Sequence, residues 1–233
     1  MELPGDLVGA RLDRVERRAK YLLFRFGDRS LIVHLGMSGR LRVVSRSTPL
    51  IKHDHVDIAF EGDRVLRLND PRRFGSVHHV EGAVEDHWLL EHLGPEPLGE
   101  DFSGEYLHRR SRRVRQAVKT FIMDARVVVG VGNIYANEAL FRAGIRPRVA
   151  AGRISRARHG RLVEAIRATL GEAIEAGGTT LRDYVGSNGE PGYFAQSLNV
   201  YGREGELCRA CGTVLTGIRL GQRATVYCPK CQQ

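Results

Sequence analysis

The sequence lacks any apolar run near the roughly 18 residues that a membrane-spanning helix needs. Its first residues also lack the order of basic, apolar and small residues that marks a signal peptide. Internal repeats and low-complexity segments are missing too. What is present is a chain of 233 residues, 42% of them hydrophobic, which is enough for one or two ordinary domain cores and a small appendage. We therefore expect a globular cytoplasmic protein with no membrane partner.

Lysine and arginine are absent from residues 74–108, a stretch that holds eight acidic side chains. Residues 109–126 reverse the balance, with six arginines and one lysine against Asp124 alone. The whole chain carries a formal net charge of +9, and a basic surface attracts polyanions because binding releases their counterions. A basic cluster is equally typical of a solvated helix face. Charge therefore favours a nucleic-acid partner without establishing one.

Four stretches in the N-terminal part of the chain are rich in β-branched or aromatic side chains. Turn-forming residues around Gly27 and Gly62 suit hairpins between such stretches. A series of short strands joined by hairpins predicts a β-sandwich or barrel. The stretches are 15–26, 31–44, 55–60 and 65–68.

Beyond residue 103 the apolar period changes from that of strands to that of helices. The preceding segment, 81–103, breaks both periods and contains Pro95 and Pro97, so we expect a linker there. The clearest helix is 155–176, which Ser155 can cap and a pair of glycines can end. Its expected apolar face consists of Leu162, Ile166, Leu170 and Ile174. The other two expected helices are 112–123 and 134–142.

All four cysteines fall in the last 26 residues, as two C-x2-C pairs separated by 16 residues. Soft thiolates in two close pairs suit tetrahedral zinc, and so short a segment cannot build a sufficient core without such a clip. Two disulfides are disfavoured in a reducing cytosol, and a redox dithiol does not need two pairs. Between the pairs, residues 213–220 and 223–227 predict a hairpin. We predict one structural zinc ion held by Cys208, Cys211, Cys228 and Cys231.

The stretch Gly130-Val131-Gly132-Asn133 leads into an expected helix. Glycine lets the backbone approach a ligand, and a helix N-terminus offers free N–H groups to a phosphate. We expect Asn133 to cap this helix. The motif alone is also typical of a simple turn between helices.

Nine short motifs occur in a fixed order along the chain. They are RAKYL (18–22), HLGMSG (34–39), KHDHVD (52–57), DPRRFG (70–75), GVGN (130–133), GGTTL (177–181), GYF (192–194), VYGR (200–203) and QRAT (222–225). Because of these motifs, the chain resembles formamidopyrimidine-DNA glycosylase, the bacterial base-excision family for oxidised purines. The resemblance extends from about residue 7 to residue 233.

The resemblance implies an α+β multidomain fold with DNA lying in the cleft between the domains. A β-sandwich occupies 1–95, a helix-two-turn-helix domain 96–198 and a zinc finger 199–233. The expected partner is double-stranded damaged DNA, bound by a monomer in the bacterial cytoplasm near the nucleoid. The only expected cofactor is the structural zinc.

The resemblance also assigns roles to individual residues. A glycosylase must expel its target nucleotide and fill the hole left in the stack. The residues that match the family's stack-filling side chains are Met37, Arg72 and Phe74. Without the resemblance, Met37 and Phe74 are more typical of core residues. The residues that match its DNA contacts are Lys20, His53, Arg72, Arg113, Asn133 and Arg223, of which Lys20 and Arg223 also match residues of the elimination steps.

The family's nucleophile is an N-terminal proline, which attacks the sugar C1′ and forms a Schiff base while the next residue, a glutamate, moves protons. The first residues, Met1-Glu2-Leu3-Pro4, are similar to the Pro-Glu-Leu-Pro with which the family's proteins begin. Residues 8–20, however, match the middle of the family's first domain, so we take this similarity as due to chance. We expect the sandwich to be truncated by a few tens of residues and this nucleophile to be absent from the chain. The alternatives are a non-catalytic damage-binding relative, an endonuclease VIII-type glycosylase for oxidised pyrimidines and a zinc-ribbon adaptor.

Overall fold

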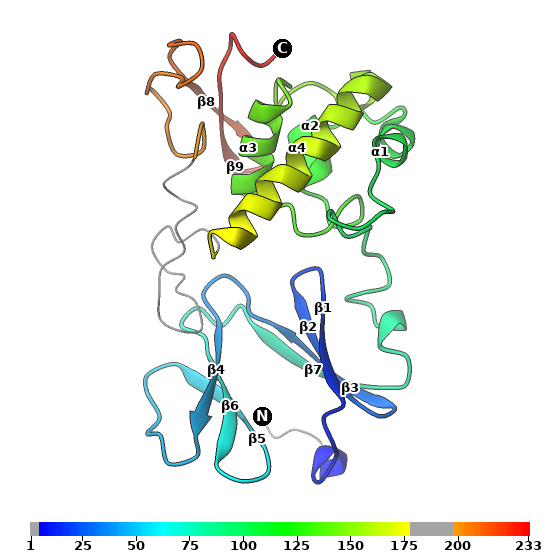
Figure 1. The fold of residues 1–233 in the computed structure, drawn as a ribbon, viewed down its shortest axis with the longest axis vertical. Coiled ribbons are helices and arrows are strands. Elements are labelled where there is room, and N and C mark those ends of the chain that lie inside the picture. Colours follow the sequence, from blue (N-terminus) through cyan, green and yellow to red (C-terminus); the bar gives the residue numbers. More distant parts are fainter. Residues whose placement is uncertain (1–4, 178–197) are drawn as a thin grey trace. The chain divides into compact units, whose positions relative to one another are not determined.

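The computed structural model describes residues 5–177 and 198–233 (Figure 1). The GYF motif, most of the GGTTL motif and residues 1–4 therefore lie outside the described residues. The described residues divide into two compact units, of which the first comprises 5–91 and the second 92–177 and 198–233. Each unit is described by itself.

The first unit is built from two antiparallel sheets. One sheet has the strand order β1-β2-β3-β7 and the other the order β4-β6-β5. Buried Phe24 and Leu31 of the first sheet pack with Leu41, Ile58 and Leu66 of the second, which confirms the predicted β-sandwich. The strands are β1 (Arg14–Arg18), β2 (Tyr21–Phe26), β3 (Arg29–His34), β4 (Arg40–Ser45), β5 (Asp54–Ala59), β6 (Arg64–Asn69) and β7 (Ser76–Glu81).

Two of the predicted strands are interrupted by turns. The stretch 15–26 is a hairpin, since Arg18 pairs with Tyr21 and Ala19 has a φ of 54°. The stretch 31–44 is broken between β3 and β4, where Gly36 has a φ of 64°. The apolar pattern continues through both turns, and a left-handed alanine carries no turn signal in a sequence. Lys20 and Met37 consequently lie in turns rather than in strands.

The prediction of a linker at 81–103 is only partly right. The segment contains a short 3-10 helix, η2 (Val84–Asp86), and several turns. Val84 and Phe102 are fully buried, and Leu90 is nearly so. The proline-rich composition hides these isolated apolar anchors because they follow no regular period.

The second unit contains four helices in the part of it that the structure describes: α1 (Gly104–Ser111), α2 (Val118–Ile122), α3 (Asn133–Arg142) and α4 (Arg156–Glu175). The short 3-10 helix η3 (Ala151–Arg153) precedes α4. The core of the unit includes Phe102, Ile122, Leu140 and Leu162. None of the described helices is both long and apolar enough to span a membrane.

Helix α4 follows its prediction closely. The Ser155 hydroxyl accepts a hydrogen bond from the Arg158 backbone N–H at 3.4 Å, as an N-cap residue does. Leu162, Ile166 and Leu170 are buried, but Ile174 is 66% exposed. In the last turn Ala173 takes the inward position instead, packed near Leu198.

The predicted helix 112–123 is wrong in its first half. Helix α1 ends at Ser111 and α2 begins only at Val118. Between them Arg113 has a φ of 64°, and the backbone of Val114 accepts a hydrogen bond from the Gly152 N–H at 3.0 Å. Arginine has good helix propensity, so its sequence run conceals a turn that is fixed by distant backbone contacts.

Helices α1 and α4 pack in direct contact. A Cβ atom on Gly104 would lie 2.7 Å from the Gly160 Cα, so only glycine fits this crossing. One turn further on, the Nδ1 atoms of His108 and His159 lie 3.4 Å apart. Burial, with a smaller contribution from His108, lowers the pKa of His159 from 6.5 to about 4.

This histidine pair predicts a loss of stability in acid. As the pH falls below 6.5 the unfolded chain protonates residue 159, whereas the folded chain does so only near pH 4. The stabilising effect of neutral His159 is therefore present above pH 6.5 and lost toward pH 4. Between pH 7 and 4 we expect the wild type to lose about 3 kcal/mol more of its free energy of unfolding than the variant His159→Phe. Urea unfolding of both proteins at each pH measures the difference, and equal losses would contradict the assignment.

The C-terminal segment forms the predicted hairpin. Strand β8 (Thr216–Leu220) pairs with β9 (Arg223–Tyr227). Gly221 and Gln222 have φ values of 53° and 63°, as a two-residue hairpin turn of this hand requires. Strand β8 begins slightly later than predicted, and Arg223 follows the turn directly.

Candidate nucleic-acid interface

The two apolar side chains that the resemblance assigns to stack filling are exposed. Met37 is 61% and Phe74 is 60% exposed, so neither belongs to the core. The Arg72 guanidinium donates to the Met37 sulfur across 3.9 Å. A cluster of Met37, Arg72 and Phe74, which we call the wedge, therefore combines exposed apolar groups with a positive charge.

The backbone around the wedge is tightly packed. Gly36 has a φ of 64°, and a Cβ atom there would lie 2.7 Å from the Phe74 carbonyl carbon. Any larger residue would push the turn that carries Met37 away from the segment that carries Phe74. The spacing HLGMSG followed by DPRRFG thus places two distant segments in direct contact.

Lys20 lies at the same end of its sheet as Met37. Lys20 immediately precedes Tyr21, which pairs with His34, and the turn with Met37 follows His34. The Tyr21 and His34 rings lie 5.1 Å apart. Burial, then the nearby charge of Lys20, lowers the pKa of His34. The charged form of His34 is therefore disfavoured beside Lys20.

His53 is tied to the segment that leads to the wedge. It has a φ of 75°, and its carbonyl accepts a hydrogen bond from the Asp70 backbone N–H at 2.9 Å. The carbonyl of Lys52 accepts another from the Asn69 side chain at 3.0 Å. Sequence reasoning missed Asn69 and Asp70, which hold this loop through the Asn69 side chain and the Asp70 backbone.

In the second unit, Asn133 and Arg223 come together. Asn133 does not cap α3: the N-cap is Gly132, and the Asn133 side chain instead donates to the Ala224 carbonyl at 3.2 Å. Asn137 accepts a hydrogen bond from the Val226 N–H at 2.9 Å. These bonds attach β9 to α3, because asparagine can donate to one backbone and accept from another.

Lys119 is a further attachment that sequence reasoning missed. Its ammonium is fully buried and donates to the Ala224 carbonyl at 2.9 Å and to the Thr225 hydroxyl at 2.6 Å. Burial, and then the charge of Arg223, lowers the pKa of Lys119 to about 8. A lysine inside the apolar run VKTFI is the one signal in the sequence that could have drawn attention to it.

Glu138 holds the segment that enters the finger. Its carboxylate is buried and accepts from the backbone N–H groups of Asn199, Val200 and Tyr201 at 2.8–2.9 Å. An ionised carboxylate is a strong acceptor for such a row of donors. Sequence reasoning did not single out Glu138, because its partners lie about sixty residues away along the chain.

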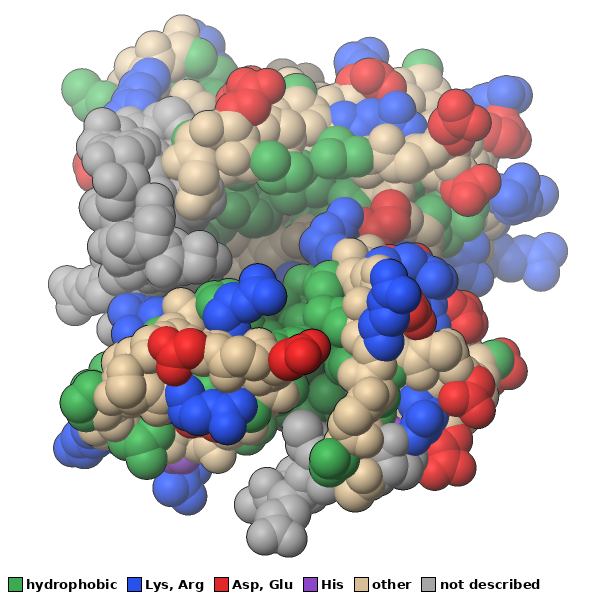
Figure 2. Space-filling model, turned by 60° about the horizontal axis from the view of Figure 1, so that its bottom comes forward, with side chains coloured by type: hydrophobic (Ala, Val, Ile, Leu, Met, Phe, Trp, Pro, Cys, Tyr) green, Lys and Arg blue, Asp and Glu red, His purple; other side chains and the backbone are tan. Residues whose placement is uncertain are grey.

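Arg113 stands in the loop between α1 and α2. It is exposed, as are Arg112 and Arg115, and its left-handed backbone marks a tight turn. The face drawn in Figure 2 carries lysine and arginine side chains in several separate groups, with acidic groups among them. Charge alone therefore does not outline the interface.

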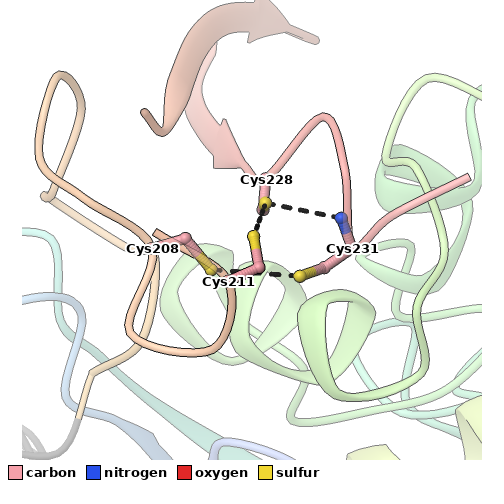
Figure 3. Close-up of side chains that lie close together, drawn as sticks. All are labelled: Cys208, Cys211, Cys228 and Cys231. Atoms are coloured by element: carbon pink, nitrogen blue, oxygen red, sulfur yellow. Dashed lines mark hydrogen bonds between the residues drawn. The ribbon is translucent and has the colours of Figure 1, made fainter. Parts of the chain in front are cut away.

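The four cysteines form the predicted cluster. All four sulfurs lie within 4.8 Å of one another, with Cys208 and Cys231 at 4.0 Å and Cys211 and Cys228 at 3.4 Å (Figure 3). A tetrahedral zinc ion with Zn–S bonds of about 2.3 Å needs sulfurs about 3.8 Å apart. The residues present therefore fit one zinc ion.

Ionisation of the thiols supports the same assignment. A hydrogen bond from Thr213, with others, lowers the pKa of Cys211 to about 6. Hydrogen bonding with Cys211, then burial, raises the pKa of Cys231 to about 12. One thiolate thus makes the next harder to form, and a divalent cation is the group that relieves this repulsion.

Three family models match the chain. The model of the formamidopyrimidine-DNA glycosylase N-terminal domain matches residues 1–77, and that of the formamidopyrimidine-DNA glycosylase H2TH domain matches residues 93–185. A third, described as a zinc finger found in FPG and IleRS, matches residues 205–233. Together they cover most of the chain.

Curated relatives and solved structures agree with these models. The formamidopyrimidine-DNA glycosylase of Stutzerimonas stutzeri is 61% identical, with 100% of this chain and 86% of the relative covered. That of Hahella chejuensis is 57% identical, with the same coverage. The structure of MutM (FPG) from Thermus thermophilus has a TM-score of 0.86 and 39% identity, covering 96% of this chain and 84% of that one. The complex of Lactococcus lactis Fpg with DNA containing an abasic site has a TM-score of 0.87 and 34% identity, covering 97% and 83%.

Proposed function

The chain belongs to the formamidopyrimidine-DNA glycosylase family, and we propose that it removes oxidised purines from duplex DNA and then cuts the strand as a lyase. The proposal covers 8-oxoguanine and formamidopyrimidines. The observation that carries it on this chain is the exposed wedge of Met37, Arg72 and Phe74. Exposed apolar side chains beside an arginine have no use in a core, but they suit insertion into a base stack.

The wedge fits the physical demand of the reaction. An enzyme that acts on a base inside a duplex must first extrude that nucleotide, which costs stacking and pairing energy. Apolar side chains that enter the gap replace lost stacking, as in other proteins that kink DNA. The Arg72 guanidinium can hydrogen-bond the orphaned partner base, since arginine is a good donor to base edges.

The remaining positions are assigned to the DNA backbone. Lys20 and Arg113, which are exposed, and His53, which is half-buried, supply cationic or hydrogen-bonding groups in turns. Asn133 and Arg223 lie together where β9 meets the first turn of α3. Contacts of this kind hold a bent duplex in register and carry no sequence information of their own.

Lys20 and Arg223 are also assigned to the elimination steps. A lysine can donate a proton to a leaving phosphate, because its ammonium titrates within reach of physiological pH when its surroundings change. A guanidinium keeps its charge, so Arg223 orients and neutralises the phosphate. Zinc, when bound, supplies structure only, closing the finger that carries Arg223.

The test uses a duplex with 8-oxoguanine opposite cytosine. The proposed function predicts release of the oxidised base and strand cleavage. A covalent adduct after borohydride reduction, in which an amine of the chain has formed a Schiff base with the sugar, would overturn the expectation that the nucleophile is absent. The same duplex with guanine is the control. Tight binding without release would contradict the enzyme assignment and leave a lesion-binding protein. Faster release from a duplex with an oxidised pyrimidine would favour an endonuclease VIII-type enzyme.

Arg113 offers a test of the phosphate contacts. Replacing Arg113 by Gln should weaken binding to damaged and undamaged duplexes equally and reduce the slope of log affinity against log salt by about 1. Filter binding at several salt concentrations measures the slope. Arg161, exposed on α4, is the matched control, and Arg161→Gln should leave the slope unchanged. An unaltered slope for Arg113→Gln would refute its assignment.

We further assign a bacterial cytoplasmic location near the nucleoid and action as a monomer. The location is supported by the DNA substrate, and the monomer by a recognition site assigned within one chain. Sedimentation with a short lesion duplex should give one protein per duplex. A complex with two proteins would contradict the monomer.

A further inference from the structure

A buried carboxylate lies behind the wedge. Asp70 is only 2% exposed, although it immediately precedes the exposed Pro71-Arg72 pair. Its Oδ1 accepts a hydrogen bond from the Ser38 hydroxyl at 3.3 Å, and its Oδ2 accepts one from the Gly75 backbone N–H at 2.7 Å. Ser38 follows Met37 and Gly75 follows Phe74. One carboxylate therefore joins the residues next to both apolar members of the wedge.

The backbone of Asp70 extends this network to a third segment. Its N–H donates to the His53 carbonyl at 2.9 Å, and its carbonyl lies 3.1 Å from the His55 Nε2. The same carbonyl accepts a longer hydrogen bond from the Arg73 N–H at 3.3 Å. Asp70 thus also holds the loop that contains His53, a proposed phosphate contact.

The packing around the carboxylate leaves no room for an added carbon atom at Gly75. A Cβ atom on Gly75 would lie 2.9 Å from the Asp70 Oδ2 and 2.9 Å from the His34 carbonyl oxygen. The two segments of the wedge are therefore interlocked through Asp70 rather than merely adjacent. Removal of the carboxylate would leave the Gly75 N–H without its acceptor and free both segments to move apart.

We propose that Asp70 is a positioning residue for base-stack insertion. It sets the spacing between Met37 and Phe74 before DNA arrives, so that the wedge enters the stack without first being ordered. A site that is already ordered loses less conformational freedom on binding. The proposal rests on the proposed function of the wedge and adds the group that maintains its geometry.

The test compares affinity for an abasic-site duplex with affinity for the undamaged duplex. The variant Asp70→Ala should lower the wild-type preference for the abasic duplex by about tenfold, while affinity for undamaged DNA changes by less than about twofold. Asp70→Asn should retain most of the preference, because its amide oxygen can still accept from Gly75 and its NH2 can donate to the Ser38 hydroxyl. If Asp70 only stabilised the fold, its removal would change the affinities for the abasic and the undamaged duplex by similar factors.

Asp63 provides the matched control. It also accepts two hydrogen bonds at a strand end, from the Ser45 hydroxyl at 2.6 Å and the Arg46 N–H at 3.1 Å, but it is not linked to the wedge by them. Asp63→Ala should keep the wild-type preference. If Asp70→Ala does not fold, Ser38→Ala, which removes only one contact, should still lower the preference by about threefold.

The outcomes separate this inference from the function on which it rests. A folded Asp70→Ala or Ser38→Ala protein with the full wild-type preference would overturn the positioning role alone. A wild-type protein without any preference would overturn the proposed function, and the positioning role with it. A preference lowered equally by Asp63→Ala would also overturn the role, since the effect would not depend on the wedge.

Discussion

Removal of zinc should weaken binding to an abasic-site duplex by roughly a hundredfold, about the loss of two charge-assisted contacts. Either a chelator or the variant Cys228→Ser should have this effect. The reason is that β9 carries Arg223 and also accepts, at Ala224, the hydrogen bonds of Lys119 and Asn133. When β9 loses its shape, the two proposed DNA contacts, Arg223 and Asn133, lose their positions.

The finger cannot keep that shape by packing alone. Its buried cluster consists of a few side chains around Val200, Leu215 and Val226, together with the cysteines themselves. An isolated two-stranded hairpin is marginal in water, and small zinc domains gain most of their folding free energy from the metal. The four sulfurs are therefore part of the core as well as ligands.

Fluorescence anisotropy with a labelled duplex measures the loss. Zinc added back after chelation should restore affinity, and Leu207→Ala, an exposed change in the same finger, should leave it unaltered. If the zinc-free protein bound as tightly as the holoprotein, the finger would not be part of the interface.

The double variant Met37→Ala/Phe74→Ala should lose roughly a hundredfold of its preference for abasic over undamaged DNA, because stacking of a side chain on a base contributes about 1–3 kcal/mol. No charge is removed, so the salt dependence of binding should not change. The same competition assay at two salt concentrations measures both quantities.

Val43 supplies the control for this variant. It is 68% exposed in the same unit and lies outside the wedge. Val43→Ala should keep the preference of the wild type. If the double variant kept its preference as well, insertion of Met37 and Phe74 into the stack would be wrong.

The sequence predicted the elements of both units better than their ends. Stretches rich in β-branched and aromatic side chains identified the sandwich, but these stretches run through the turns at Ala19 and Gly36, where the backbone reverses. The arginine-rich helix was misplaced because contacts from Val114 to residue 152 fix a loop there. Local propensity does not contain such long-range constraints.

The candidate site divides in the same way. The cysteine spacing alone predicted the zinc ligands, because two C-x2-C pairs are the typical sequence pattern of a tetrahedral zinc site with four thiolates. Met37 and Phe74 would have been placed in the core from pattern alone, and only the resemblance assigned them to a surface. Lys119 contacts Ala224, 105 residues away along the chain, so no local signal could reveal that pairing.

Asp70 shows why supporting residues are the hardest to predict. Its motif, DPRRFG, drew attention to the arginine and phenylalanine that face outward. The carboxylate acts through Ser38, 32 residues earlier, and the pairing of β4 with β6, which sets Arg40 opposite Asn69, brings the two segments together. Residues that contact a ligand can be recognised in a sequence by their chemical type. Residues that position such contacts are recognised mainly by their geometry in the folded structure.

Fluorescence of 2-aminopurine placed beside 8-oxoguanine in a duplex tests the central claim most directly. If the protein extrudes the lesion, the reporter base loses its stacking neighbour, so its emission should rise severalfold on binding. The Met37→Ala/Phe74→Ala variant should bind with little or no rise. Full binding by the wild type without any rise in emission would contradict the account, because the lesion would then have remained in the stack.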